Sequence, residues 1–220
     1  MKVIKFGGSS LASSGQVRKV VDIVKTDDAR RFVVVSAPGK RDSADIKVTD
    51  LLIQLYERKL AHKSLTPLIE EIFSRFREIG EAFGIGEEHL AAIHLDLEAV
   101  NQLPIENNPH LYDHILSRGE DNNAKLVAGI LQAEGVNARY INPKDLGILV
   151  TDEPGNARVL YKAYRKIKKW ADSEAVLVIP GFFGYTEEGN ICTFSRGGSD
   201  ISGSIVAAGV KADLYENFTD

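Results

Sequence analysis

Apolar positions in the first 36 residues change from a strand pattern to a helical pattern and back again. Residues 3–6 and 32–36 are short apolar runs, and valines recur at helical spacing between them, at Val17, Val20, Val21 and Val24. A strand, a helix and a second strand in that order are typical of a βαβ unit. The pattern therefore predicts an α/β fold with a parallel sheet.

Beyond this unit, helical spacing dominates residues 48–103, which we expect to form a helical cap or lid beside the sheet. A helix is also predicted at 123–133 with Gly135 just past its end, another begins with Asn156 as its N-cap, and a third ends at Gly209. The same reasoning predicts strands at 138–141, 175–179 and 212–216, and a hairpin turn at 187–190. We find no repeat or linker, so one domain is expected.

Composition narrows the class of protein. The chain is 44% hydrophobic and 26% charged, which is ordinary for a soluble globular protein. A net charge of −4 gives no electrostatic reason to expect binding to nucleic acid or to an anionic membrane. The longest apolar runs, such as 175–179, are too short to cross a bilayer, and the first residues lack a secretory signal. Cys192 is the single cysteine, which suits a reducing compartment, so we expect a cytoplasmic protein.

Two loops with the same Gly-Gly-Ser sequence follow predicted strands, at residues 7–9 and 197–199. Glycine lets the backbone approach a ligand, and the free N–H groups of a helix N-terminus attract anions. Loops at the carboxyl ends of strands are where ligands bind in such folds. The loop at 7–10 matches neither a Walker A nor a dinucleotide motif, and Gly39-Lys40 fails the Walker test because Arg41 follows it. A tight turn without any ligand is the alternative for each loop.

Charged residues beside these loops are candidates for chemistry. Lys5 precedes the first loop in an apolar strand, and it is either a solvated edge lysine or a point charge directed at phosphate. In the second loop Arg196 is a natural partner for a carboxylate. Ser199 or Asp200 could instead serve only as an N-cap.

Glu120 has two interpretations that the sequence leaves open. The segment 117–120 fits a capping box, in which the glutamate only closes a helix start. His110 and His114 are four residues apart, but no third ligand is evident, so we expect a solvated pair and no metal site. We expect Cys192 to be a buried small hydrophobic residue.

These signals coincide in order with the motifs of a known family. Lys5-Phe6-Gly7-Gly8-Ser9-Ser10 resembles the opening signature of aspartate kinases in the amino-acid kinase superfamily. Gly119-Glu120, Arg196-Gly197-Gly198-Ser199-Asp200 and Thr219-Asp220 resemble further motifs of that family, as do the segments 34–37 and 48–52. The resemblance implies a three-layer α/β/α sandwich around a mainly parallel sheet.

The resemblance also implies an activity, namely transfer of the γ-phosphoryl group of ATP to the β-carboxylate of L-aspartate, which begins lysine, threonine and methionine biosynthesis. It assigns Lys5 to the transferred phosphoryl group, and it assigns Asp200, together with Glu120, to the α-ammonium group of aspartate, with Asp200 also orienting Lys5. It implies that the remaining candidates bind ATP, at Gly7, Gly8, Ser9, Thr219 and Asp220, or aspartate, at Ser36, Thr49, Glu120, Arg196, Gly197, Gly198 and Ser199. Mg²⁺ is expected to accompany ATP, and a homo-oligomer is expected.

Several points stay open at this level. The second loop, Ser36-Ala37-Pro38-Gly39-Lys40-Arg41, is more basic than in many relatives, and the roles of Lys40 and Arg41 are undefined. Members of the family continue beyond Thr219-Asp220 into further nucleotide contacts and ACT domains, so we expect this chain to turn over ATP poorly by itself. The alternatives are a sibling kinase acting on glutamate, N-acetylglutamate or UMP, and a fragment that binds aspartate or mediates assembly without catalysis.

Overall fold

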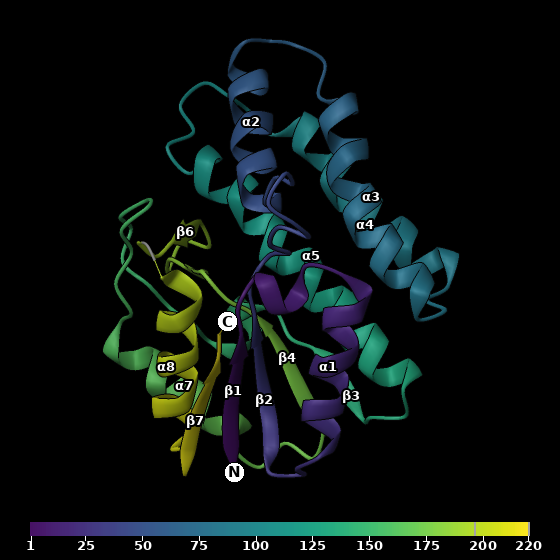
Figure 1. The fold of residues 1–220 in the computed structure, drawn as a ribbon. Coiled ribbons are helices and arrows are strands. Elements are labelled where there is room, and N and C mark those ends of the chain that lie inside the picture. The colour runs from purple at the N-terminus through teal and green to yellow at the C-terminus, as the bar shows by residue number, and fades with distance from the viewer. Residues whose placement is uncertain (196, 220) are drawn as a thin grey trace.

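A parallel five-stranded sheet forms the centre of the molecule in the computed structural model, which describes residues 1–195 and 197–219 (Figure 1). The strand order is β3-β4-β2-β1-β7. The strands span, in sequence order, β1 Lys2–Phe6, β2 Arg30–Val35, β3 Ala138–Tyr140, β4 Val176–Pro180 and β7 Leu214–Phe218. A separate antiparallel hairpin pairs β5 (Phe183–Tyr185) with β6 (Ile191–Thr193).

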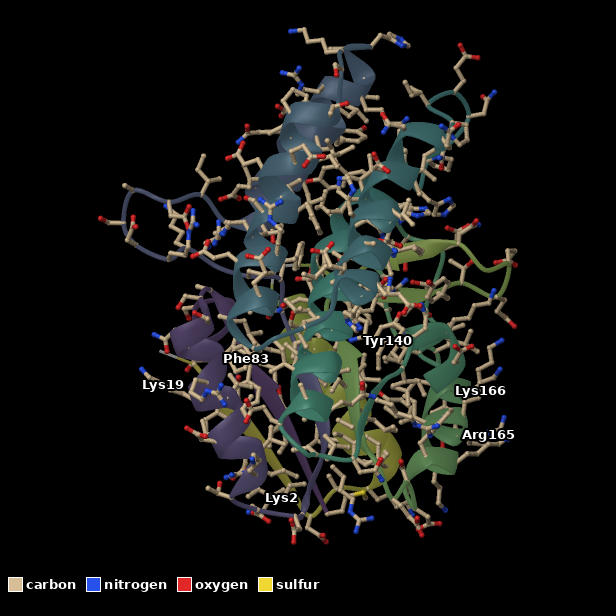
Figure 2. All side chains as sticks on the ribbon, turned by 90° about the vertical axis from the view of Figure 1, so that its right-hand side faces the viewer. Lys2, Lys19, Phe83, Tyr140, Arg165 and Lys166 are labelled. Atoms are coloured by element: carbon tan, nitrogen blue, oxygen red, sulfur yellow. The ribbon has the colours of Figure 1, made fainter. Side chains whose placement is uncertain are left out.

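Helices cover both faces of the sheet, which gives the expected α/β/α sandwich. The helices are α1 Ser14–Lys25, α2 Val48–Leu60, α3 Thr66–Ala82, α4 Glu87–Glu98, α5 Leu111–Ala133, α6 Pro143–Leu146, α7 Tyr161–Ile167 and α8 Gly198–Val210, with short 3₁₀ turns at Ser9–Leu11, Ala99–Gln102 and Lys168–Trp170. In Figure 1, α2, α3 and α4 rise above the carboxyl end of the sheet, and the long helix α5 joins them to it. Figure 2 shows side chains filling the space between these layers.

Alternation along the strands divides the core in two. Ile4 and Phe6 pack into one apolar cluster together with α1 to α5, whereas Val3 packs into the other together with α7 and α8. The same alternation holds on β2, where Val33 and Val35 face the first cluster. Because successive strand side chains point to opposite faces, Lys5 shares the α8 face with Val3. This places its ammonium near the start of α8.

The helix predicted at 123–133 in fact begins at Leu111, so the capping-box interpretation of Glu120 is wrong. Residues 117–120 lie in the middle of α5, far from either end. The polar residues that hid this helix in the sequence are buried and paired with one another. Arg118 lies 3.1 Å from both Asp96 and Asp121, and the hydroxyl of Tyr140 donates to Asp121 at 2.6 Å. These tertiary partners replace the apolar periodicity that a sequence pattern detects.

Other predicted boundaries shift. Asn156 is not an N-cap, because α7 begins at Tyr161 after an extended segment whose Val150 and Val159 form a β-bridge. The last strand is 214–218 rather than 212–216. The hairpin turn at 187–190 and the position of Gly135 after α5 are confirmed. No helix within residues 1–195 or 197–219 is long and apolar enough to cross a membrane.

Candidate functional site

The loops that follow β1 and β2 meet the start of α8 at the carboxyl edge of the sheet and enclose a cavity of about 590 Å³. Helix α2 and the middle of α5 complete the wall. The lining residues are Lys5, Gly8, Ser9, Ser36, Ala37, Pro38, Gly39, Lys40, Lys47, Thr49, Asp50, Glu120, Phe182, Ser195, Gly197, Gly198, Ser199 and Asp200. The two Gly-Gly-Ser loops, 190 residues apart in the sequence, therefore share one site.

Lys5 is a buried lysine, which excludes the solvated-edge interpretation. Its strand lies between β2 and β7, its side chain is only 7% exposed, and Nζ lies 2.8 Å from Oδ1 of Asp200. Asp200 occupies the first turn of α8. The carboxylate forms an ion pair with the lysine, and the ammonium group lies at the cavity wall, where an anionic group could reach it.

The first Gly-Gly-Ser loop, at residues 7–9, packs at van der Waals distance against the loop that follows β2, at residues 36–41. The N–H of Gly39 donates to the carbonyl of Gly8 at 2.8 Å. A Cβ on Gly39 would lie 2.6 Å from the carbonyl carbon of Gly8, so no larger residue fits without moving a backbone. Ser9 and Ser36, which lie beside this contact, both line the cavity, and the close approach explains the requirement for glycine at both positions.

The loop before α8 is shaped by strained and close-packed backbone. Gly197 has φ of +78°, a conformation that glycine adopts without steric cost. Phe182 shows the same φ although it carries a side chain, and its N–H donates to the Ser202 hydroxyl at 2.9 Å. A Cβ on Gly181 would lie 2.7 Å from Oγ of Ser199. Non-glycine residues with a positive φ cluster at functional sites, because the surrounding contacts must hold this strained backbone conformation.

Glu120 is a buried carboxyl group that faces the cavity from α5. Burial raises its pKa to about 8, while a hydrogen bond from the backbone N–H of Ala37 acts in the opposite direction. Oε2 accepts no hydrogen bond from the residues that the structure describes. Gly119 allows this approach, since a Cβ there would lie 2.8 Å from the Cβ of Ala37. A buried carboxyl with an unused oxygen is suited to bind a cationic group.

Positive charge at the mouth comes from Lys40 and Lys47, which are exposed and line the same cavity as Lys5. The neighbouring Arg41 does not line it. Arg41 instead forms ion pairs with Asp45, at 3.0 Å, and with Glu78, at 2.9 Å. Asp45 also lies 3.1 Å from the buried Arg75, and this network fixes the second loop against α3. The cavity of a net-negative chain thus concentrates lysines where an anion would enter.

Most of the candidate residues proposed from the sequence come together in this cavity: Lys5, Gly8, Ser9, Ser36, Thr49, Glu120, Gly197, Gly198, Ser199 and Asp200. Gly7 does not line it, although its Cα lies close enough to Lys5 that an added Cβ would sit 3.6 Å from Nζ. Thr219 is exposed just after β7 and is not part of the lining. Arg196 and Asp220 lie outside the described residues.

Sequence reasoning missed four contributors to the site. Lys47 and Asp50 flank Thr49 around the start of α2, and Phe182 packs against Gly198 of the second Gly-Gly-Ser loop. Asn217, on β7, donates to Oδ1 of Asp200 at 3.1 Å. The signal for Phe182 is the preceding Pro180-Gly181 pair, which marks a sharp change of direction. Asn217 carries no such signal, because only the strand register places it beside Lys5.

Comparison with known proteins gives a consistent result. The sequence profile of the amino acid kinase family matches residues 1–220. Aspartokinase 3 of Bacillus subtilis is 48% identical over the whole chain, which covers 48% of that protein. The Clostridium acetobutylicum aspartate kinase structure superposes on the whole chain with a TM-score of 0.83 and 36% identity, again over 48% of its length. Escherichia coli aspartokinase III, solved with aspartate and ADP, shares the fold at a TM-score of 0.83 and 24% identity. The chain thus spans about half the length of these relatives, and it belongs to the amino acid kinase family.

Proposed function

We propose that the protein is an aspartate kinase, which transfers the γ-phosphoryl group of ATP to the β-carboxylate of L-aspartate and forms 4-phospho-L-aspartate and ADP. The observation that carries this proposal is that the Lys5–Asp200 ion pair and the buried Glu120 line the same cavity. It combines a site for transferred negative charge with a site for a substrate ammonium group. The names of the Bacillus and Clostridium relatives support the same reaction.

The chemistry asks little of the protein beyond positioning and charge. The attacking β-carboxylate is already ionised at neutral pH, so no general base is needed. Negative charge spreads over the transferred oxygens in the transition state, and a fixed ammonium group stabilises it. The ion pair between Lys5 and Asp200, at 2.8 Å, supports this role for Lys5 and an orienting role for Asp200. We assign Lys5 and Asp200 to catalysis on that basis.

Aspartate has three charged groups, and the cavity offers a partner for its single cation. Glu120 would receive the α-ammonium group, with its unpartnered oxygen as the acceptor. The backbone of Gly197, Gly198 and Ser199 at the start of α8 would receive a carboxylate, helped by the positive end of the helix. Ser36 and Thr49 would add hydroxyl contacts. Arg196 is assigned to the α-carboxylate from its motif.

ATP would enter from the side of the first glycine loop. Gly8 and Ser9 line the cavity there, and Gly7, Thr219 and Asp220 are assigned to the nucleotide from their motifs. Lys40 and Lys47 could meet the outer phosphates. Mg²⁺ would neutralise the phosphate charge. Among the described lining residues the carboxylates are Asp50, Glu120 and Asp200, and they form no three-carboxylate cage. This donor set fits an ion bound mainly through ATP oxygens.

The deciding experiment is a coupled ADP-release assay with L-aspartate, L-glutamate, N-acetylglutamate, UMP or no acceptor. We expect ADP release that depends on L-aspartate, together with a hydroxamate product from the acyl phosphate. Release that depends on another acceptor would favour a sibling kinase. Aspartate binding without turnover in any longer form of the protein would favour a non-catalytic module. We further propose that the enzyme is a cytoplasmic homo-oligomer that serves lysine, threonine and methionine biosynthesis.

A further inference from the structure

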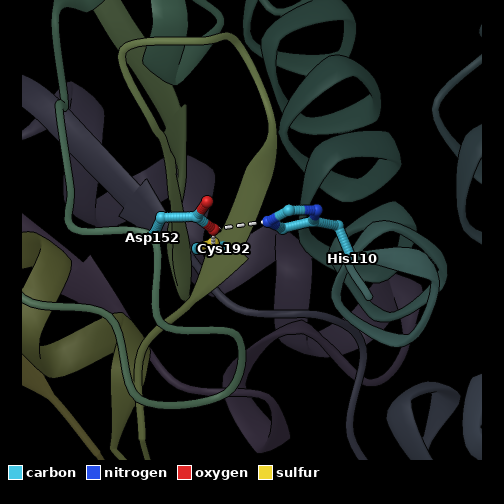
Figure 3. Close-up of side chains that lie close together, drawn as sticks. All are labelled: His110, Asp152 and Cys192. Atoms are coloured by element: carbon cyan, nitrogen blue, oxygen red, sulfur yellow. Dashed lines mark hydrogen bonds and ion pairs between the residues drawn. The ribbon is translucent and has the colours of Figure 1, made fainter. Parts of the chain in front are cut away.

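Three side chains from distant parts of the sequence, none of which lines the cavity, lie close together (Figure 3). His110 precedes α5, Asp152 lies in the loop after α6, and Cys192 is the middle residue of β6. Their donor atoms Nε2, Oδ1 and Sγ all lie within 4.8 Å of one another. Within residues 1–195 and 197–219, no other group of three His, Cys, Asp or Glu side chains meets this criterion.

The three segments are fixed to one another by a buried carboxylate that is not one of the three. Asp113 lies in the first turn of α5, and its Oδ2 accepts hydrogen bonds from Thr193 N at 2.6 Å and from Gly155 N at 2.8 Å. Thr193 adjoins Cys192, and Gly155 belongs to the same loop as Asp152. The backbone segments that carry His110, Asp152 and Cys192 are therefore fixed close to one another by the fold.

We propose that His110, Asp152 and Cys192 form a binding site for a divalent metal ion of the zinc class. An imidazole, a thiolate and a carboxylate are all ligands of Zn²⁺, and three protein ligands with a solvent molecule in the fourth position complete a tetrahedron. A mixed nitrogen, sulfur and oxygen set disfavours Mg²⁺ and Ca²⁺, which prefer oxygen alone. The site does not depend on the phosphoryl-transfer proposal.

The two distances to Oδ1 of Asp152 fit this proposal after a small adjustment, and the donor atoms of His110 and Cys192 lie within 4.8 Å of each other. Sγ of Cys192 lies 3.7 Å from Oδ1 of Asp152, and Nε2 of His110 lies 2.5 Å from the same oxygen. Ligand atoms around tetrahedral zinc are separated by about 3.3 to 3.7 Å, given bonds of about 2.0 to 2.3 Å. The His110–Asp152 pair must therefore open by less than about 1 Å. Asp152 can do this, because its side chain is 53% exposed.

Binding would exchange protons for the ion. The thiol of Cys192 gives its proton to solvent as the sulfur–metal bond forms, since the thiolate is the ligand. The ion also replaces the proton with which His110 Nε2 donates to Asp152; that proton leaves to solvent, and the ring binds through Nε2 in its neutral form with a proton on Nδ1. A cavity of about 250 Å³, lined by His110 together with His114, Tyr185 and Asn190, provides a path from solvent. His110, for which the sequence offered only His114 as a neighbouring ligand, thus acquires two ligands from other segments, and His114 is not one of them.

Such an ion would brace the strand that leads to the catalytic loop. Only Phe194 and Ser195 stand between β6 and residue 196, and Gly197 begins the turn into α8. Fixing Cys192 to the start of α5 would restrict this strand relative to the helix that carries Glu120. We therefore expect metal binding to raise thermal stability and to leave the cavity open.

Cobalt(II) is a suitable probe, because a thiolate bound to it gives a near-ultraviolet charge-transfer band. Titration of the metal-free chain, kept reduced with a phosphine, should produce this band at one Co²⁺ per chain, and Zn²⁺ should displace it. Cys192 is the single cysteine, so the band can come from no other residue. Cys192→Ser should abolish the band. His110→Gln and Asp152→Asn should each weaken Co²⁺ binding by about 10-fold or more.

His94→Gln is the matched control, because His94 pairs with Glu70 at 2.8 Å, away from this cluster. It should leave Co²⁺ affinity within twofold of the wild type. His110→Gln and Asp152→Asn replace partly exposed side chains, so their folding can be verified from the melting temperature. Absence of the band at millimolar Co²⁺ in the folded chain would overturn the site. A band whose affinity is unchanged in both of these variants would also overturn it, since it would report adventitious thiolate binding only.

Discussion

Lys5 and Asn217 are register partners on the neighbouring strands β1 and β7, and both reach the same oxygen of Asp200. The lysine Nζ lies 2.8 Å from Oδ1, and the asparagine Nδ2 lies 3.1 Å from it. Residues in register on parallel strands point to the same face of the sheet. The strand pairing therefore builds a triad in which Asp200, at the start of α8, is held from two sides.

Replacing Lys5 should affect catalysis far more than folding. Lys5→Met keeps the length of the side chain and removes its charge, so the transferred phosphoryl group loses a fixed cation. We expect kcat to fall by about 100-fold or more. Lys2→Met is the control, because Lys2 begins the same strand, at the end of the molecule away from the helices α2 to α4 (Figure 2), and it pairs with Asp27. If Lys5→Met retained kcat within threefold of the wild type, Lys5 would have no catalytic role.

Asn217 should act as a positioning residue through Asp200. Asn217→Ala removes one hydrogen bond, a loss of about 0.5 to 1.5 kcal/mol, which corresponds to a decrease in kcat of about 2- to 13-fold. Asn217→Asp places a second carboxylate against Asp200 and should lower kcat further. Because Asn217 is exposed, both variants should fold. Unchanged kcat in both, at normal melting temperature, would show that Asp200 needs no help from β7.

Aspartate binding should become tighter as the pH rises from 7 to 9. Burial raises the pKa of Glu120 to about 8, so the free site carries mostly a neutral carboxyl at pH 7. The α-ammonium of aspartate requires the ionised form, and the apparent Kd is increased by the missing fraction. We expect Kd to fall about 10-fold over this range. Titration calorimetry in two buffers of different ionisation heat should also detect proton release.

The matched variant separates this role from packing. Glu120→Gln cannot ionise, so its aspartate Kd should be nearly independent of pH between 7 and 9. At pH 9 it should bind more weakly than wild type by about 10-fold or more, since charge-assisted hydrogen bonds contribute about 1.5 to 3 kcal/mol. Equal pH dependence in both proteins would remove Glu120 from the aspartate site.

The same carboxyl should make the ligand-free chain less stable at alkaline pH. A folded-state pKa above the usual value of 4.5 means that the folded chain retains a proton that the unfolded chain releases. This contribution to stability is complete below about pH 4.5 and is lost as the pH rises through about 8. Between pH 6 and pH 9 the melting temperature of Glu120→Gln should therefore decline less than that of the wild type. Each difference of about 1 kcal/mol in the free energy of unfolding between the two proteins corresponds to about 2–4 °C in melting temperature. Parallel profiles would contradict the raised pKa.

The elements of the fold that could be predicted from the sequence are those with a local sequence signature. The first βαβ unit, the hairpin turn at 187–190 and the glycine loops have local signatures, and they lie where the sequence predicted them. The start of α5 was missed because its first three turns bury Asp113 and Arg118, which have partners in distant segments. Periodicity cannot register polar residues whose burial is offset by tertiary ion pairs.

The candidate site shows the same division. The resemblance selected Lys5, Glu120 and Asp200 from their motifs, and the fold brings them to one cavity. Asn217 and the cluster around Cys192 could not be found in this way. Asn217 reaches the site because its strand pairs with that of Lys5, far away in the sequence, and it then bonds Asp200 at the other end of α8. The cluster around Cys192 joins residues at least 40 positions apart.

Gly39→Ala should damage both stability and activity, because the contact between the two loops leaves no room for a methyl group. Its Cβ would lie 2.6 Å from the carbonyl carbon and 2.8 Å from the oxygen of Gly8, and backbone atoms cannot rotate away. We expect a loss of about 1–3 kcal/mol of stability, typical of overpacking, and a higher KM for ATP as Gly8 and Ser9 shift.

Gly15→Ala is the control: this glycine lies in the first turn of α1, where a Cβ would meet only the Ser13 hydroxyl at 4.0 Å. Alanine there should stabilise the chain by about 0.5–1 kcal/mol. Chemical denaturation and ATP kinetics of the two variants decide the matter, and wild-type stability and KM in Gly39→Ala would show that the loops can separate without cost.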